Sequence, residues 1–305
     1  MTQVSIGIPV YNGDKYLAQA LDSLLAQSFK DFEVVISDNA STDGTAEICQ
    51  AYRNKDARIR YFRSDRNLGA AWNHNRVFEL SSAPLLKWAA CDDLLHPLFL
   101  ERCVEALHKD PGVVLSHTYV RMIDELGQAL RRRDQGSGFI DRSNRFVPPQ
   151  DRTHIAEAVE PEARFRDVLS HAWWCVQCFG VMRRDAFLRT SGHGNYWGAD
   201  KVFLAELALQ GRFLQVPEPL FEQRVHDGCS FGKKDIHELE EHMDTARSHG
   251  FYHFQMFRDY IKLAATANLS VRQRLHCLSS AARLTVRPGP WRQALHRFEL
   301  MLGRA

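Results

Sequence analysis

Apolar runs alternate with longer stretches of helical period along the first 120 residues. These runs predict strands at residues 4–10, 32–36, 59–62, 84–90 and 113–119, and the first of them is rich in β-branched residues. Between the first two runs, apolar residues recur on one helix face at Leu17, Ala20, Leu21, Leu24 and Leu25. Further helices are expected up to residue 52, from residue 67 and over 97–109. This alternation predicts an α/β fold, a mainly parallel twisted sheet with helices on both faces.

The pattern changes after the fifth strand. Residues 131–160 are charged and contain Gly, Ser and Pro, which predicts a long loop that serves either as a binding loop or as a poorly ordered surface segment. The elements expected beyond it are helices at 162–171, 184–190 and 199–210, and strands at 175–182, 213–216 and 220–225. From residue 235 the chain reads as helical, with a break at 288–290 before a last helix at 291–302. We expect a main domain over 1–235, divided into halves 1–120 and 121–235, and a C-terminal helical extension over 236–305.

Composition and charge limit the class of protein. The 305 residues are 45% hydrophobic and 25% charged, with a formal charge of +2, so no nucleic-acid partner is expected. The N-terminus lacks the pattern of a secretion signal, and no apolar run approaches the roughly 18 residues that span a bilayer. We expect a cytoplasmic protein, or one attached to a membrane face. The arginines and aromatic residues of 291–302 suit either a membrane surface or packing on the domain, and the C-terminal helices could also pair subunits.

Several site types are excluded or disfavoured by missing motifs. The first strand is not followed by G-x-G-x-x-G, and no G-x-x-x-x-G-K-[ST] occurs, which disfavours dinucleotide oxidoreductases and P-loop enzymes. Seven cysteines, an odd number, do not suggest a disulfide framework. Cys175 and Cys178 form a C-x-x-C without a second pair at zinc spacing, so we expect buried thiols in a strand.

An acidic pair, Asp92 and Asp93, follows the expected strand at 84–90 and precedes Pro97. Ligands of open α/β sheets bind at the carboxyl ends of the strands, where these carboxylates would lie. Mg²⁺ is commonly held by one or two carboxylates together with substrate phosphates. The alternative is that Asp92 caps the helix that starts near Pro97 while Asp93 is merely solvated.

Four segments in order resemble the successive motifs of family 2 glycosyltransferases, which are inverting enzymes with the GT-A fold. They are Ile8-Pro9-Val10-Tyr11-Asn12, Ser37-Asp38-Asn39-Ala40-Ser41-Thr42-Asp43-Gly44-Thr45, Arg66-Asn67-Leu68-Gly69, and Cys91-Asp92-Asp93 followed by Pro97. The similarity covers the first 120 residues and resumes at Gly198-Ala199-Asp200 and Arg224-Val225-His226. The C-terminal helices fall outside it.

The resemblance implies a nucleotide site in the first half of the chain. Asp38 matches the aspartate that binds the nucleobase; a carboxylate only accepts hydrogen bonds, which suits uracil, thymine or guanine better than cytosine. Pro9 and Tyr11 match the loop beside the base and ribose, and Arg66 matches a region that contacts the nucleotide. The alternative for Asp38 is an Asx-turn that caps the next helix.

The resemblance also implies a metal and a base. Asp93 would bind Mg²⁺ or Mn²⁺ directly, with Asp92 near the ribose or a metal-bound water, and the metal would act as a Lewis acid on the leaving diphosphate. His226 matches a position that completes the metal or diphosphate site in some members, or it is an ordinary loop histidine. Asp200 would be the general base, or only an N-cap. The family's preceding glutamate is Ala199 here, which puts the acceptor contact in doubt.

Trp173, Trp174 and Trp197 flank the second half of the expected site, and Trp197 is either an acceptor platform or a core residue. We therefore predict a metal-dependent inverting glycosyltransferase that moves a sugar from a UDP, dTDP or GDP donor to a hydroxyl of a glycan, a lipid-linked glycan or another small acceptor. A role in bacterial surface polysaccharide is an analogy. A sugar-phosphate nucleotidyltransferase is an alternative, although its Gly-rich N-terminal loop is absent. A catalytically silent nucleotide-sugar-binding protein is another, favoured by Ala199.

Overall fold

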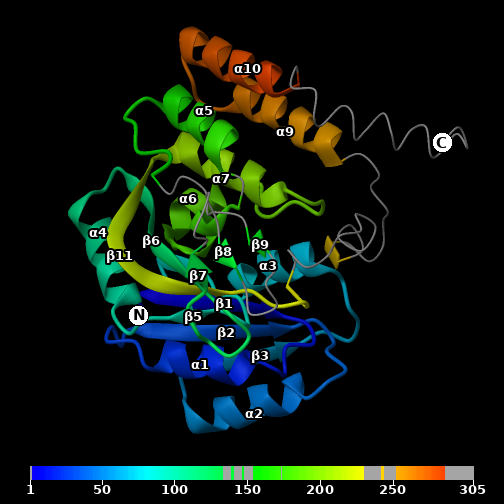
Figure 1. Ribbon diagram of the computed structural model, residues 1–305. Helices are drawn as coiled ribbons and strands as arrows, with labels where there is room; N and C mark the ends of the chain where they lie inside the picture. The colour runs from blue at the N-terminus through cyan, green and yellow to red at the C-terminus, as the bar shows by residue number, and fades with distance from the viewer. Residues whose placement is uncertain are drawn as a thin grey trace, which may run out of the picture.

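An eight-stranded sheet forms the centre of the protein, with strand order β3-β2-β1-β4-β10-β6-β11-β5 (Figure 1). The structure is a computed structural model. It describes residues 2–132, 139–140, 146–147, 154–172, 174–229, 242–243 and 252–285. Helices cover both faces of the sheet, as the sequence predicts, and the last described helices form an outer layer over one face.

The first half is a parallel α/β unit. Its elements are β1 (Val4–Val10), α1 (Leu17–Leu25), β2 (Phe32–Asp38), α2 (Thr45–Lys55), β3 (Ile59–Arg63), α3 (Ala70–Glu79) and β4 (Leu85–Trp88). β1 pairs in parallel with β2 and β4, and β2 pairs in parallel with β3. The predicted strands are confirmed, and β1, β2 and β4 are almost entirely buried, as expected of strands covered on both faces of a sheet.

The second half adds antiparallel pairs. Its elements are β5 (Leu94–Leu95), α4 (Phe99–Lys109), β6 (Val113–Ile123), β7 (Arg131–Arg132), β8 (Phe139–Ile140), β9 (Phe146–Val147), α5 (Pro161–His171), the 3₁₀ helix η1 (Val176–Phe179), β10 (Val181–Arg183), α6 (Arg184–Leu188), α7 (Ala199–Gln210), β11 (Arg212–Arg224), α9 (Tyr252–Thr266) and α10 (Val271–Thr285). β10 is antiparallel to both β4 and β6, and β6 is parallel to β11. The short strands β7, β8 and β9 form a separate small sheet within the predicted loop.

The structure differs from the predicted strands in two places. The strand expected at 175–182 is a 3₁₀ turn followed by the short β10, because Cys175 adopts a left-handed conformation with φ of 53°. A short buried apolar run has no period that separates a strand from a helical turn. The two strands expected at 213–216 and 220–225 are one strand, β11, whose register shifts on either side of Pro219.

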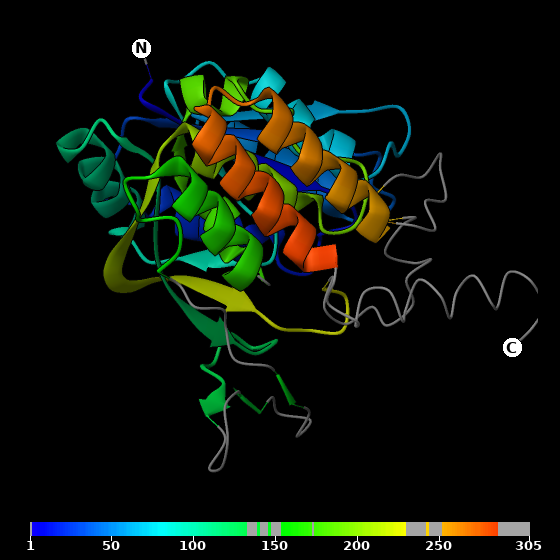
Figure 2. The same cartoon turned by 90° about the horizontal axis from the view of Figure 1, so that it is seen from above.

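The core has two parts, one on each face of the sheet. One part joins the sheet to α1, α2 and α4. The other joins it to α3, α5, α6 and α7, and it also takes in Tyr260, Leu263 and Ala264 of α9 and Cys277 and Ala281 of α10. Figure 2 shows α5, α9 and α10 side by side above the sheet. The described C-terminal helices are therefore packed on the main domain through a shared hydrophobic core.

Some predictions fall outside the described residues. These are Trp173, most of the loop at 131–160, and the helix at 291–302 with its membrane-contact alternative. Within the described part of the chain, no helix combines the length and apolar character needed to cross a bilayer.

Candidate active site

The loops that follow β1 and β2 are joined at the carboxyl edge of the sheet. The backbone N–H of Asn12 donates to Ser41 Oγ at 2.9 Å, and that of Gly13 donates to Thr45 Oγ1 at 2.9 Å. Asn12 and Ala40 both have positive φ, 51° and 62°, which short side chains at tight turns tolerate at some cost. Ligands of open α/β sheets bind at this edge, so the two loops form one wall of the candidate site.

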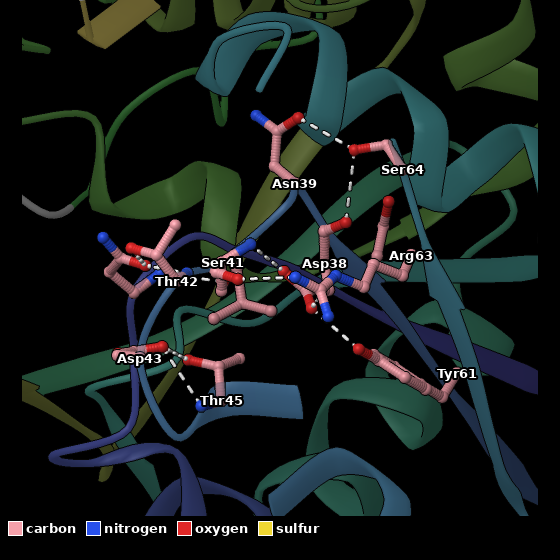
Figure 3. Close-up of polar contacts among 12 residues, drawn as sticks. Asp38, Asn39, Ser41, Thr42, Asp43, Thr45, Tyr61, Arg63 and Ser64 are labelled. Atoms are coloured by element: carbon pink, nitrogen blue, oxygen red, sulfur yellow. Dashed lines mark hydrogen bonds and ion pairs between the residues drawn. The ribbon is translucent and has the colours of Figure 1, made fainter. Parts of the chain in front are cut away.

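Asp38, the last residue of β2, is fully buried behind this wall. Its Oδ1 accepts the backbone N–H of Ser41 at 2.8 Å, and its Oδ2 accepts the Tyr61 hydroxyl at 2.7 Å and lies 3.6 Å from Arg63 Nε (Figure 3). The local contact expected of an Asx-type turn is therefore present. Each carboxylate oxygen has a second acceptor position, so these contacts do not exhaust its capacity.

Asp43 connects the two loops. Its Oδ2 accepts the N–H of Asp14 at 3.1 Å, and its Oδ1 accepts both the N–H and the hydroxyl of Thr45. Burial alone would raise the pKa of the Asp43 carboxyl, but these hydrogen bonds lower it below its ordinary value. The carboxylate is therefore a fixed structural anion that holds the start of α2 against the β1 loop.

Asn39 connects the β2 loop to residues 67–69. Its Nδ2 donates to Asn67 Oδ1 at 2.8 Å and to Gly69 O at 3.1 Å, and its Oδ1 accepts the N–H of Leu68 at 3.0 Å. Arg66, just before this segment, is exposed. Sequence reasoning missed the part played by Asn39, although the residue lies inside a recognised motif.

The acidic pair meets the end of β11. Asp92 Oδ2 lies 2.9 Å from His226 Nε2, and Asp93 Oδ1 accepts the backbone N–H of Arg224 at 2.8 Å. Asp93 is only 8% exposed, so it is not a solvated carboxylate. The N-cap of α4 is Leu98 without a side-chain cap, so Asp92 does not cap that helix. The expected alternative, a helix cap at Asp92 and a solvated Asp93, is therefore wrong.

Burial raises the pKa of Asp93 well above its ordinary value, and the neighbouring Asp92 raises it further. The Arg224 N–H and the ammonium of Lys87 act in the opposite direction. Lys87 is itself fully buried, and its Nζ donates to the carbonyls of Trp88 and Phe179. The buried Asp93 carboxyl therefore lies between an acidic neighbour, Asp92, and two cationic side chains, Lys87 and Arg224.

The side chain of Arg224 holds the acidic loop through several hydrogen bonds. Its Nε donates to Asp92 O at 2.8 Å, and its Nη1 donates to the carbonyls of Asp124 and Glu125 at 3.2 and 3.1 Å. Its Nη2 donates to Gln19 Oε1 at 3.0 Å, and its guanidinium lies 4.5 Å from the ring centre of Tyr16. Sequence reasoning identified Arg224 only as part of a motif, because none of these partners is near it in sequence.

A divalent cation fits this donor set as an incompletely caged ion. Among the residues that the structure describes, no cluster of three or more His, Cys, Asp or Glu side chains has the arrangement of a full metal site. The adjacent carboxylates of Asp92 and Asp93 match the one or two carboxylates with which Mg²⁺ and Mn²⁺ bind beside substrate phosphates, and the His226 imidazole lies next to Asp92.

Asp200 lies in the first turn of α7. The N-cap of that helix is Gly198, without a side-chain cap, so the N-cap alternative for Asp200 is wrong. The Asp200 carboxylate accepts the N–H of Lys201 at 2.9 Å and is hydrogen bonded by the Cys175 thiol. Burial raises its pKa against these bonds. A carboxyl with a raised pKa suits a general base near neutral pH.

The charges of Asp93 and Asp200 both act on one buried thiol, that of Cys178. Burial raises the pKa of the Cys178 thiol, and the charges of both Asp200 and Asp93 raise it further. The two carboxylates therefore lie within electrostatic range of one buried sulfur, although they come from opposite halves of the chain. No separate role for the C-x-x-C pair is needed to explain its burial.

The remaining predicted side chains border this region. Tyr11 is 43% exposed, and Pro9 is partly buried at the end of β1. Trp197 is partly buried, and Trp174 Nε1 donates to Gln223 Oε1 at 3.1 Å on the neighbouring β11. The exposed Tyr11 ring can pack against a planar group, whereas Trp174 is tied to the sheet.

Comparison with known proteins gives one family. The model described as "Glycosyl transferase family 2" matches residues 5–189. A curated relative, glycosyltransferase GlyG of Streptococcus pneumoniae, is 28% identical over 117 residues, which is 38% of this chain and 39% of the relative. The chain spans less than half the length of the curated relatives that it matches first.

Solved structures share the fold. TarS of S. aureus, residues 1–349 in complex with UDP-GlcNAc, has a TM-score of 0.68 and 18% identity, covering 92% of this chain and 71% of that one. A mannosyltransferase of Pyrobaculum calidifontis in complex with GDP-Man and Mn²⁺ has a TM-score of 0.56 and 16% identity, covering 99% and 76%. The expected GT-A fold is thereby confirmed.

Proposed function

The chain belongs to glycosyl transferase family 2, and from this membership we propose that it transfers a sugar from a nucleotide diphosphate donor to a hydroxyl acceptor. The observation that carries the proposal is the junction of the acidic pair with the end of β11, where Asp93 meets Arg224 and Asp92 meets His226. It brings two carboxylates and an imidazole to the edge of the sheet where ligands of this fold class bind.

The donor base is proposed to bind against Asp38, with Pro9 and Tyr11 beside the base and ribose and Arg66 near the nucleotide. The hydrogen-bond capacity of Asp38 supports this role, because its carboxylate is positioned by Ser41 and Tyr61, retains free acceptor positions, and as an acceptor distinguishes imide N–H groups from a ring acceptor. UDP, dTDP and GDP donors fit this chemistry. The fold neighbours described with UDP-GlcNAc and GDP-Man are consistent with it.

Asp93 and His226 are proposed to hold Mg²⁺ or Mn²⁺, with Asp92 beside them. When bound, the cation supplies Lewis-acid stabilisation of the leaving diphosphate. Arg224 holds the acidic loop at the end of β11, and burial together with the neighbouring Asp92 raises the pKa of Asp93.

Asp200 is proposed as the general base. It would accept the proton of the acceptor hydroxyl as the oxygen attacks the anomeric carbon from the side opposite the diphosphate, which inverts the configuration in one displacement. Burial supports this role, because it raises the pKa of the carboxyl toward the working range of a base. Trp197, three residues earlier, is the proposed platform for the acceptor sugar.

The roles of the different parts of the chain are also a proposal. Residues 1–120 would bind the nucleotide and residues 121–235 the acceptor, with 236–305 as a helical extension. The acceptor would be a glycan or lipid-linked glycan, and polysaccharide biosynthesis is the setting that this chemistry suits. A location in the cytoplasm, with or without peripheral membrane contact or subunit pairing through the C-terminal helices, belongs to the same proposal.

One observation favours a second candidate, a nucleotide-sugar-binding protein without turnover: Ala199 stands where the resemblance implies a glutamate. A donor-hydrolysis assay with UDP-, dTDP- and GDP-sugars and Mn²⁺ separates the two. We expect release of the nucleoside diphosphate by the wild-type protein and its loss in Asp200→Asn. Binding without release, for every donor and in an acceptor library, would contradict the enzymatic proposal. Pyrophosphate release from a nucleoside triphosphate would instead indicate a nucleotidyltransferase.

A further inference from the structure

The segment that leads into α7, residues 190–198, is here called the entry loop. It carries Trp197 and ends one residue before the helix that holds Asp200. The family match ends at residue 189, so the entry loop, α7 and α9 all lie beyond it. The packing of these elements is therefore a feature of this chain that the family match does not describe.

One side of the entry loop is held by α3. Asn75 Nδ2 donates to the carbonyl of His193, and the N–H of His193 donates to Asn75 Oδ1, both at 2.8 Å. Gly192 has φ of +70°, and a Cβ there would lie 2.5 Å from Asn75 Oδ1. The amide of Asn75 thus pairs with the backbone as a neighbouring strand would, which only a glycine at 192 permits.

The other side is held by α9. The Tyr196 hydroxyl donates to Asp259 Oδ2 at 2.6 Å, and the Tyr196 side chain is almost fully buried. Gly198 has φ of +83°, and a Cβ there would lie 2.9 Å from Met256 Sδ, so α9 lies directly against the backbone before Asp200. A hydrogen bond to a carboxylate is shorter and stronger than one between neutral groups.

Helix α9 is itself anchored. Its Tyr260, Leu263 and Ala264 are buried in the core that also contains residues of α5 and α7. Asp259 is held by a second bond, because its Oδ1 accepts Arg258 Nε at 2.9 Å. The carboxylate that receives the Tyr196 hydroxyl thus belongs to a helix packed in the core, and the entry loop is bonded on one side to α3 and on the other to α9.

We propose that Tyr196 and Asp259 are positioning residues, which use α9 to hold the entry loop and the first turn of α7 so that Asp200 keeps its reactive orientation. This inference rests on the proposed function, because it explains how the proposed base is held. Helix α9 is then needed for turnover, because it holds the loop that leads to Asp200. A C-terminal extension without this role could be removed without loss of turnover.

The test compares Tyr196→Phe, Asp259→Asn and the double variant with the wild-type protein. We expect the turnover number kcat to fall by about 10- to 100-fold, because small misplacements of a reacting group have effects of this size. The dissociation constants of UDP, dTDP and GDP with Mn²⁺ should stay unchanged. The double variant should be no slower than the slower single variant, since both remove the same bond.

Tyr52→Phe is the matched control. It removes a bond of the same chemistry, from the Tyr52 hydroxyl to Asp22 Oδ1 at 2.8 Å, between α2 and α1 on the other face of the sheet. We expect it to leave kcat at the wild-type value. A general loss of stability would lower the melting temperature in all variants, whereas a positioning role lowers kcat only in those of Tyr196 and Asp259.

Hydrogen–deuterium exchange supplies a readout that does not depend on turnover. Backbone amides of 190–203 should exchange faster in Tyr196→Phe and Asp259→Asn, while those of 39–45 should not change. Unchanged exchange at 190–203 would overturn the inference, and so would faster exchange with an unchanged kcat. In either case the Asp200→Asn variant still tests the proposed function separately. A wild-type protein without turnover would contradict the proposed function alone, and the exchange rates would still decide whether α9 holds the loop.

Discussion

The carboxylate of Asp93 accepts the backbone N–H of Arg224 at 2.8 Å, across 131 positions of sequence. This bond joins the loop after β4 to the end of β11, and it places the acidic pair next to His226. A buried carboxylate in this position is costly, because its pKa is raised well above the ordinary value by burial and by Asp92. The cost is expected where a site is built to receive a cation.

Asp93→Asn should separate charge from structure. Its amide oxygen can still accept the Arg224 N–H, so we expect a melting temperature equal to or above that of the wild-type protein and no donor hydrolysis. Asp93→Ala should also lose activity and be destabilised by about 1–3 kcal/mol, because the buried N–H loses its partner. Thermal unfolding and a hydrolysis assay check both results; full activity in Asp93→Asn would be incompatible with a metal role for this residue.

Asp200→Asn should lower kcat by about 10²- to 10⁴-fold, the usual contribution of a general base, without weakening donor binding. Burial raises the pKa of Asp200 in the folded state. The stability that it contributes is complete below the unfolded pKa of 3.8 and is lost as the pH rises through the folded pKa. The variant should therefore gain stability relative to wild type above that window. Urea unfolding at pH 4 and pH 7 checks the sign, and equal differences at the two pH values would contradict it.

Arg224→Lys should destabilise the fold by about 3 kcal/mol or more, because a lysine cannot replace the guanidinium bonds to Asp124, Glu125 and Gln19. Arg121→Lys is the control: Arg121 pairs with Glu222 at 3.1 Å on the same two strands, but its side chain is half exposed. Such pairs contribute about 0–1 kcal/mol. Urea unfolding measures the free energy of unfolding of both variants. An equal decrease in the two would show that the buried bonds of Arg224 stabilise the fold no more than an exposed ion pair does.

Lys87 should give the protein a pH-dependent stability. Burial lowers its pKa from 10.5 to about 8, so the unfolded chain binds more protons between these values. The free energy of unfolding should then rise by about 3 kcal/mol from below pH 8 to above pH 10.5 through this group alone. The difference between wild type and Lys87→Met isolates it: the variant should be relatively most stable at pH 7, and the advantage should shrink toward pH 10. A difference independent of pH would rule this out.

The parallel half of the fold and the grouping of its motifs could be predicted, because each strand begins as a largely apolar run that polar residues follow, and the carboxyl ends of parallel strands share one sheet edge. The proximity of Asp92 and His226 rested on family resemblance, since 134 positions separate them and no local pattern links them. The 3₁₀ turn after Cys175 and the buried bonds of Arg224 could not be predicted. They depend on tertiary packing, which a buried apolar run or a single arginine does not encode locally.

The most direct test is calorimetric titration of wild-type protein and Asp93→Asn with UDP, dTDP and GDP, each with and without Mn²⁺. We expect that at least one nucleotide binds the wild-type protein, that Mn²⁺ tightens its binding at least tenfold, and that Asp93→Asn loses the effect of Mn²⁺ while keeping metal-free binding. Binding that is equally tight with and without Mn²⁺, or an effect of Mn²⁺ that survives in Asp93→Asn, would show that this acidic pair does not hold the cation.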